Sequence, residues 1–129
     1  MKKLILILLL SSMSESYAQE RVSYEDCIKV ASVSNSSLPR RTDKVTTLTG
    51  VGCRQEAGRV IYVFNYSLDV QKSSMPKSFV KDFTHETRNE LCTTPSYRNY
   101  LKLVDLESMY YDFYHVFIGK IITTEKDCN

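Results

Sequence analysis

The sequence predicts a small α+β domain in which helices pack on one face of an antiparallel sheet. Alternating apolar residues in RVIYVFNYSLDV, residues 59–70, indicate a strand, and apolar residues recurring every fourth position over 79–91 indicate an amphipathic helix. Four cysteines in a chain with an export signal indicate disulfide bonds. The predicted element order is β-β-α-α-β-β behind a short N-terminal helix.

The first residues, MKKLILILLLSSMSESYAQE, have the features of a secretory signal peptide. Two lysines precede the apolar run 4–10, and the following polar stretch ends in the small-x-small pattern Ser16-Tyr17-Ala18. We therefore expect a signal peptide over residues 1–18, cleaved after Ala18. The run is far shorter than the roughly 20 apolar residues of a transmembrane helix. The mature chain, residues 19–129, is expected to be soluble and periplasmic or secreted.

The charge balance argues against nucleic acid as a partner. Cleavage would remove two lysines and one glutamate, which changes the formal net charge from +2 to +1. Binding to phosphates needs a basic surplus that such a chain lacks. We assign the doublet Arg40-Arg41 to a solvated linker. The mature chain is then divided into an N-terminal helix with its linker, 19–42, and an α+β core, 43–129.

The N-terminal half is predicted to contain one helix and two strands. Residues 23–33 have a weak helical pattern, with acidic residues in the first turn where the helix dipole favours them. SNSSLPRRTD, residues 34–43, is expected to be a loop. Residues 44–54 form a strand in which Gly50 and Gly52 indicate a bulge or a close backbone approach. QEAG, residues 55–58, is a hairpin connection into the 59–70 strand.

The C-terminal half is predicted to contain two helices and a second hairpin. Ser74 or Met75 can cap a helix whose first position is Pro76. Thr94 then caps a shorter helix that begins at Pro95. VDLESMYYDFYH and VFIGKIITTE, residues 104–115 and 116–125, are rich in aromatic and β-branched residues and are expected to pair.

The cysteines are expected to form two disulfides, for which their number allows three pairings. Cys92 ends the predicted long helix and Cys128 follows the last strand, so a bond between them would fasten the helices to the edge of the sheet. Cys27 and Cys53 would then join the N-terminal helix to the first strand. No two cysteines have the CxxC spacing of a redox or zinc site.

No catalytic or metal-binding motif is recognisable in the sequence. His85 begins HETRN, but Asn89 stands where a zinc-protease helix needs its second histidine. His115 is expected in a turn, without other ligands at suitable spacing. There is no serine-nucleophile motif, phosphate-binding glycine loop or catalytic carboxylate pair. We predict no catalytic residue, no metal and no cofactor, and hence a non-enzymatic protein.

The nine tyrosines leave two interpretations open. In YVFNY and MYYDFYH, aromatic residues stand on both faces of predicted strands. One face can pack against the helices while tyrosines cover the other. Alternatively, the tyrosines form a recognition surface, since tyrosine buries a large area at low entropic cost.

The run LCTTPSYRNYL, followed by VDLESMYYDFYHVFIGKIITTEKDC, resembles the C-terminal half of small type II secretion pilotins of the AspS and GspS-beta kind. In those proteins a Cys-x-x-Pro helix break precedes a strand pair that closes on a final cysteine. The ending also resembles that of other short exported bacterial proteins. The likeness covers residues 79–128 and rests on Cys92, Pro95, Leu101, Cys128 and the tyrosine-rich strand.

The resemblance implies an α+β fold and a Cys92–Cys128 bond. Pilotins of this kind bind a short amphipathic helix from the end of a secretin and carry it to the outer membrane. They are lipoproteins, whereas Gln19-Glu20-Arg21 follows the signal here, without a cysteine for lipidation. We therefore predict an accessory protein that holds a peptide or protein segment of an envelope component between its helices and sheet. The alternatives are an inhibitor or immunity protein that blocks an enzyme or toxin, and a small hydrolase.

Overall fold

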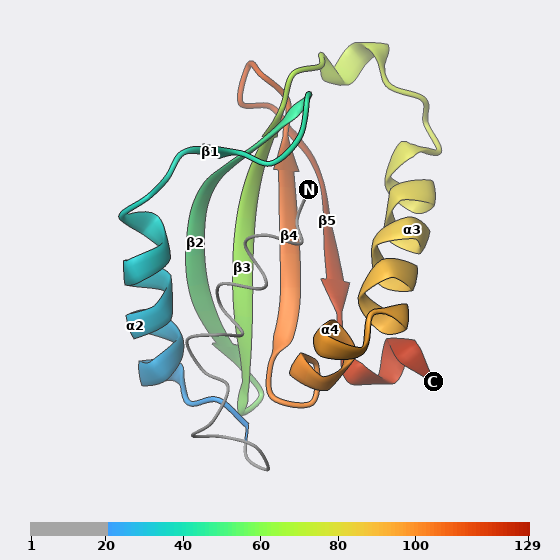
Figure 1. Ribbon diagram of the computed structural model, residues 1–129. Helices are drawn as coiled ribbons and strands as arrows, with labels where there is room; N and C mark the ends of the chain where they lie inside the picture. Colours follow the sequence, from blue (N-terminus) through green and yellow to red (C-terminus); the bar gives the residue numbers. More distant parts are fainter. Residues whose placement is uncertain (1–20) are drawn as a thin grey trace.

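One sheet with the strand order β1-β2-β3-β4-β5 forms the centre of the molecule, and the helices cover one of its faces (Figure 1). The computed structural model describes residues 21–129; the predicted signal peptide lies outside the described residues. The strands are β1 (Arg40–Arg41), β2 (Thr46–Glu56), β3 (Arg59–Leu68), β4 (Asp105–Tyr111) and β5 (Phe117–Thr123). The helices are α2 (Tyr24–Asn35), α3 (Phe79–Thr93) and α4 (Pro95–Tyr100), with the 3-10 helices η1 (Lys72–Ser74) and η2 (Glu125–Cys128). The predicted fold class is confirmed.

Both predicted hairpins are present. β2 and β3 pair antiparallel up to Glu56 and Arg59, and the two residues between them, Ala57 and Gly58, have φ of 51° and 76°. A two-residue hairpin turn needs this left-handed backbone, which glycine adopts without strain. β4 and β5 also pair antiparallel, with an irregularity next to Tyr110.

The contact between the hairpins differs from the prediction, because β3 and β4 run parallel. Their register extends from Ile61 opposite Asp105 to Ser67 opposite Tyr111. After β3 the chain passes through α3 and α4 before it returns to the sheet (Figure 1). A strand pair joined by such a crossover is parallel, whereas a short turn makes an antiparallel one.

Two segments around the sheet also differ from the prediction. Arg40 and Arg41, expected in a solvated linker, form β1 and pair with Leu48 and Thr47 of β2. The guanidinium of Arg41 lies 2.6 Å from the carboxylate of Asp69, so this arginine is engaged within the fold. The long helix starts at Phe79 instead of Pro76, after a turn in which Phe79 N donates to the carbonyl of Pro76 (3.1 Å).

The alternating pattern of β3 is confirmed by its burial. Every second residue from Val60 to Leu68 is buried on the helix-covered face. The ring of Tyr62 stacks on that of Tyr100 in α4, with centroids 6.1 Å apart, and Tyr66 stacks on Tyr110 of β4 at 5.1 Å. Packing therefore accounts for these four tyrosines.

Two disulfides fasten helices to neighbouring elements, one to a strand and one to the segment after β5, and both connect the cysteines suggested by the sequence. Cys27 of α2 is bonded to Cys53 of β2, and Cys92 of α3 to Cys128 of η2. The amide side chain of Asn35 adds a second link to β2, since it donates to the carbonyl of Val51 (2.7 Å) and accepts from its N–H (2.8 Å). These contacts hold α2 against the β2 side of the sheet (Figure 1).

The opposite face of the sheet carries charged residues in pairs. Arg54 of β2 and Lys120 of β5 both contact the carboxylate of Glu107, at 3.2 and 3.9 Å. Arg59 of β3 binds Asp105 of β4 through two hydrogen bonds. The contacts of Arg54 and Arg59 cross from the first hairpin to β4 and connect the two hairpins, whereas that of Lys120 lies within the second hairpin. Within residues 21–129, no helix has the length and apolar character needed to cross a bilayer.

Candidate binding groove beside the C-terminal disulfide

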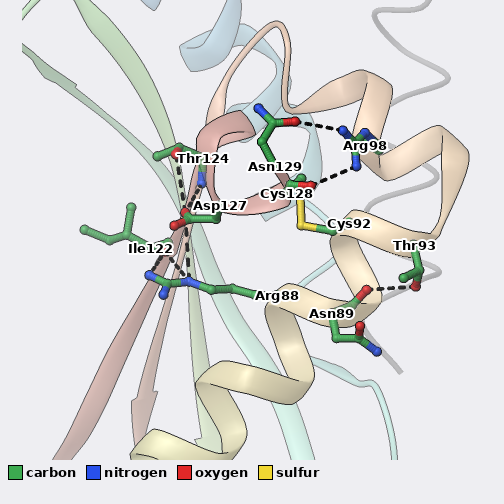
Figure 2. Close-up of a disulfide and its surroundings, with 10 residues drawn as sticks. All are labelled: Arg88, Asn89, Cys92, Thr93, Arg98, Ile122, Thr124, Asp127, Cys128 and Asn129. Carbon is green, nitrogen blue, oxygen red and sulfur yellow. Dashed lines mark hydrogen bonds and ion pairs between the residues drawn. A yellow bond between two sulfur atoms is a disulfide. The ribbon is translucent and has the colours of Figure 1, made fainter.

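A groove of about 1010 Å³ lies between the outer side of α3 and the C-terminal residues. We call it the C-terminal groove. Its walls are α3 from Lys81 to Thr93, Arg98 of α4, and residues 127–129. The Cys92–Cys128 disulfide is part of its lining (Figure 2).

The amphipathic pattern of α3 creates the first wall. Thr87 and Leu91 are buried against the core, and Phe83 contacts the ring of Tyr110 at a centroid distance of 4.9 Å. The polar residues between them point outward and line the groove, as the helical period requires. Thr94 has an extended backbone and Pro95 begins α4, so the helix ends one turn after Asn89 and places Cys92 beside the C-terminal segment.

Hydrogen bonds hold the C-terminal segment as the second wall. Arg98 donates from Nη1 to the carbonyl of Cys128 (3.1 Å) and from Nη2 to Oδ1 of Asn129 (3.0 Å) (Figure 2). The carboxylate of Asp127 accepts a hydrogen bond from the N–H of Thr124 (2.7 Å), which caps η2. This wall is thus fixed by a covalent bond, a guanidinium and a helix cap.

Arg88 connects the two walls. Its Nε and Nη2 both donate to the carbonyl of Ile122, at 3.2 and 2.7 Å, and its Nε lies 3.9 Å from Oδ2 of Asp127 (Figure 2). Ile122 belongs to the edge strand β5, whose outward carbonyls need a partner. The guanidinium of Arg88 supplies it, and this fixes the spacing between α3 and the sheet edge.

The remaining polar side chains of the groove carry charges of both signs. Lys81, Glu86 and His85 of α3 are exposed, and within residues 21–129 no ion pair or hydrogen bond engages their side chains. They can form hydrogen bonds and ion pairs with a polar segment of another molecule. The sequence did not single out Arg88, Arg98 or Asp127 because their roles depend on segments that only folding brings together.

The two histidines considered from the sequence lie on different elements. His85 is on α3 in the groove, and His115 is in the turn between β4 and β5 with φ of 64°. In the described part of the chain, no three histidine, cysteine or acidic side chains are grouped as a metal site would require. The chemistry that the described side chains of the groove provide is hydrogen bonding and charge.

The space between α3 and the sheet, where the sequence suggested a binding site, is filled by side chains of this protein. Phe79, Val80 and Phe83 of α3 face Ile118 and Ile121 of β5 across a cavity of about 10 Å³. A water molecule needs about that much space, so no peptide side chain can enter without movement of α3. The open candidate site is thus on the outer side of α3.

Searches of protein-family models and of curated proteins found no match to this sequence. Three solved structures have a similar fold. A candidate secreted protein from Pseudomonas aeruginosa matches with a TM-score of 0.63 and 14% identity over 78% of this chain and 88% of that chain.

The other two structures are pilotins. EpsS, from the type 2 secretion system of Vibrio vulnificus, matches with a TM-score of 0.58 and 14% identity over 82% of this chain and 91% of that chain. AspS, from the type II secretion system of Vibrio cholerae, matches with a TM-score of 0.51 and 13% identity over 81% of this chain and 91% of that chain. Because these likenesses span most of each chain, the resemblance noted in the sequence is confirmed at the level of fold: the protein has a pilotin-like fold.

Proposed function

We propose that the protein is an exported, non-enzymatic accessory protein that binds a peptide or protein segment of a cell-envelope component in the C-terminal groove. The observation that carries the proposal is a fixed groove on a pilotin-like fold, with one wall anchored by the Cys92–Cys128 bond. The pilotins named above are components of secretion systems. A periplasmic accessory role for this chain is consistent with its predicted signal peptide.

The dimensions and chemistry of the groove suit a short segment. Its α3 wall runs from Lys81 to Thr93, a length of about 20 Å at 1.5 Å per residue, enough to accompany three to four turns of a helix. Exposed charges of both signs line this wall, so a segment with alternating charges can pair with Lys81 and Glu86. Because Arg88 and Arg98 are already held, binding orders few side chains and loses little conformational entropy.

Site-specific photo-crosslinking in the envelope of the source organism tests this proposal. A photoreactive amino acid replaces Asn89 in the groove, and a matched control carries it at Lys29, which is exposed on α2. We expect the Asn89 probe to capture a secretin or another envelope-assembly component that the Lys29 probe does not capture. Capture of a hydrolase or toxin would favour the inhibitor function instead. Equal capture from both positions would contradict binding in the groove.

A further inference from the structure

An exposed apolar patch lies at the turn between β4 and β5. Phe113, Tyr114, Val116 and Phe117 are 49%, 59%, 45% and 42% exposed, and Val45, directly before β2, is 47% exposed. These are five of the nine large apolar residues exposed in the described part of the chain. Single exposed apolar residues are common on proteins, but a concentration at one site marks an interaction surface. We call these five residues the apolar tip.

Backbone hydrogen bonds bring the two segments of the tip close together. The carbonyl of Val45 accepts from the N–H of Asp69 (2.8 Å), and the N–H of Phe113 donates to the carbonyl of Val70 (3.2 Å). Val45 and Phe113 therefore flank consecutive residues at the end of β3, about two strand spacings or 10 Å apart. Figure 1 shows the corresponding turns together at the top of the sheet.

The tip is held in place by one buried carboxylate. Asp112 is 1% exposed, and its Oδ1 accepts from the N–H groups of Tyr114 (2.8 Å) and Val116 (2.9 Å). Its Oδ2 accepts from the N–H of Lys72 (3.0 Å), which fixes the neighbouring segment to the same turn. The aromatic side chains are thus presented outward by a preformed turn, and binding through them needs little ordering.

Two exposed lysines lie beside the tip. Lys44 and Lys72 are exposed, and among residues 21–129 neither ammonium group has an ion-pair partner. The acidic residues of this end are engaged within the fold: Asp69 by Arg41 at 2.6 Å, and Asp112 by three backbone N–H groups. Asp43 accepts from the N–H of Val45 at 2.9 Å. The tip therefore combines protruding apolar side chains with two exposed ammonium groups that have no ion-pair partner among the described residues.

We propose that the apolar tip binds the surface of an anionic lipid bilayer. Aromatic residues favour the membrane–water interface, and each lysine near anionic headgroups strengthens the attraction. A projecting turn beside Lys44 and Lys72 suits the surface of an anionic bilayer. It suits a protein partner less well, because a stable protein interface needs a larger complementary area. The inference goes beyond the proposed function, because the tip lies at the end of the sheet where β5 begins, whereas the C-terminal wall of the groove follows the other end of β5.

Tryptophan fluorescence provides a direct test, because the chain contains no tryptophan. In the mature chain, F113W places a single reporter in the tip, and V33W places one on α2, where Val33 is 70% exposed. Vesicles of phosphatidylglycerol and phosphatidylethanolamine should shift the emission of F113W to shorter wavelength and leave V33W unchanged. Pure phosphatidylcholine vesicles should produce a much smaller shift. Equal shifts at both positions, or none at F113W, would overturn the proposal.

Co-sedimentation of unlabelled variants with the anionic vesicles separates the apolar and charge contributions. F113S/Y114S should lower the bound fraction at least tenfold, and K44A/K72A should lower the affinity about fivefold per lysine. I28S/V33S, which removes exposed apolar residues from α2, should bind like the wild type. Thermal unfolding confirms that each variant is folded, as expected for exposed positions. Unchanged sedimentation of F113S/Y114S would refute the role of the tip, and crosslinking from Asn89 shows independently whether the groove still binds its partner.

Discussion

Val80 of α3 packs directly on Gly119 of β5, where a Cβ atom would lie 2.9 Å from Cγ2 and 3.2 Å from Cγ1 of Val80. The first distance is shorter than a carbon–carbon contact allows. The helix therefore approaches the strand as closely as a residue without a side chain permits. Valine in a helix is restricted to essentially one rotamer, so its side chain cannot turn away.

Gly119→Ala should consequently destabilise the protein by about 1–3 kcal/mol, the usual range for overpacking a tight contact. Val80→Ala in the same chain removes both close atoms and should recover most of that loss. Urea unfolding of the four proteins of this double-mutant cycle, with disulfides intact, measures the coupling. Additive effects of the two substitutions would show that the contact does not limit the approach of the helix.

Removal of either disulfide should destabilise the fold by about 3.5–4 kcal/mol in the loop-closure model, given sequence separations of 26 and 36 residues. The two bonds should nevertheless differ in function. C92S/C128S releases residues 127–129 from α3, so crosslinking from Asn89 should fall sharply. C27S/C53S should retain this crosslinking at temperatures where both variants are folded. An equal loss of crosslinking in both variants would show that binding depends on the overall stability of the fold and not on the C-terminal wall of the groove.

Asp112 should make the protein sensitive to acid. Burial tends to raise the pKa of this carboxyl group, but hydrogen bonds from the N–H groups of Lys72, Val116 and Tyr114 outweigh it and hold the pKa below its ordinary value. Its stabilising contribution is present above the unfolded-state pKa of about 3.9 and is lost as the pH falls through the lower folded-state pKa.

Asp112→Asn retains one acceptor oxygen but no charge, so the variant should be less stable at neutral pH and less dependent on pH below about 4. Unfolding free energies measured against pH test this expectation. Asp82→Asn is the matched control, because Asp82 is exposed and its side chain accepts none of these hydrogen bonds. A parallel pH profile for Asp112→Asn and the wild type would contradict the role of the carboxylate.

Alkaline conditions should unfold the protein through its buried tyrosines. Burial, with a smaller effect of Glu90, raises the pKa of Tyr97 to about 12, and burial followed by the neighbouring Tyr62 raises that of Tyr100. The unfolded chain ionises near the ordinary tyrosine pKa of about 10, so stability is retained below that pH and lost as the pH rises toward the folded-state values. The absorbance of these tyrosinates should appear together with loss of the folded circular dichroism signal. Ionisation of all tyrosines before any loss of structure would refute this expectation.

The local structure was largely predictable from the sequence because it follows from residues close together in the chain. Apolar residues at every second position predict β3, and apolar residues at every fourth position predict α3. The glycine at position 58 predicts the turn between β2 and β3. The parallel pairing of β3 with β4 was missed because it depends on the path of the crossover and not on either strand.

The candidate site was less predictable for the same reason. Arg88 acquires its role only when Ile122 lies beside it, and Arg98 only when Cys128 is bonded to Cys92. The aromatic run MYYDFYH was assigned to an extended segment with the turn at His115, but β4 already ends at Tyr111. Asp112 within that run was a recognisable sign of a turn, since aspartate commonly bonds the backbone two residues ahead.

Neither disulfide crosses the parallel seam between β3 and β4. One bond lies within the half that ends with β3, and the other within the half that begins with α3, so only non-covalent contacts join the two halves apart from the chain itself. A protease cut between residues 70 and 78 should leave two internally cross-linked fragments that remain associated in native buffer. Denaturant should separate them without any reductant. The seam thus offers a natural division for a split protein whose parts, produced separately, reassemble along a single pair of strands.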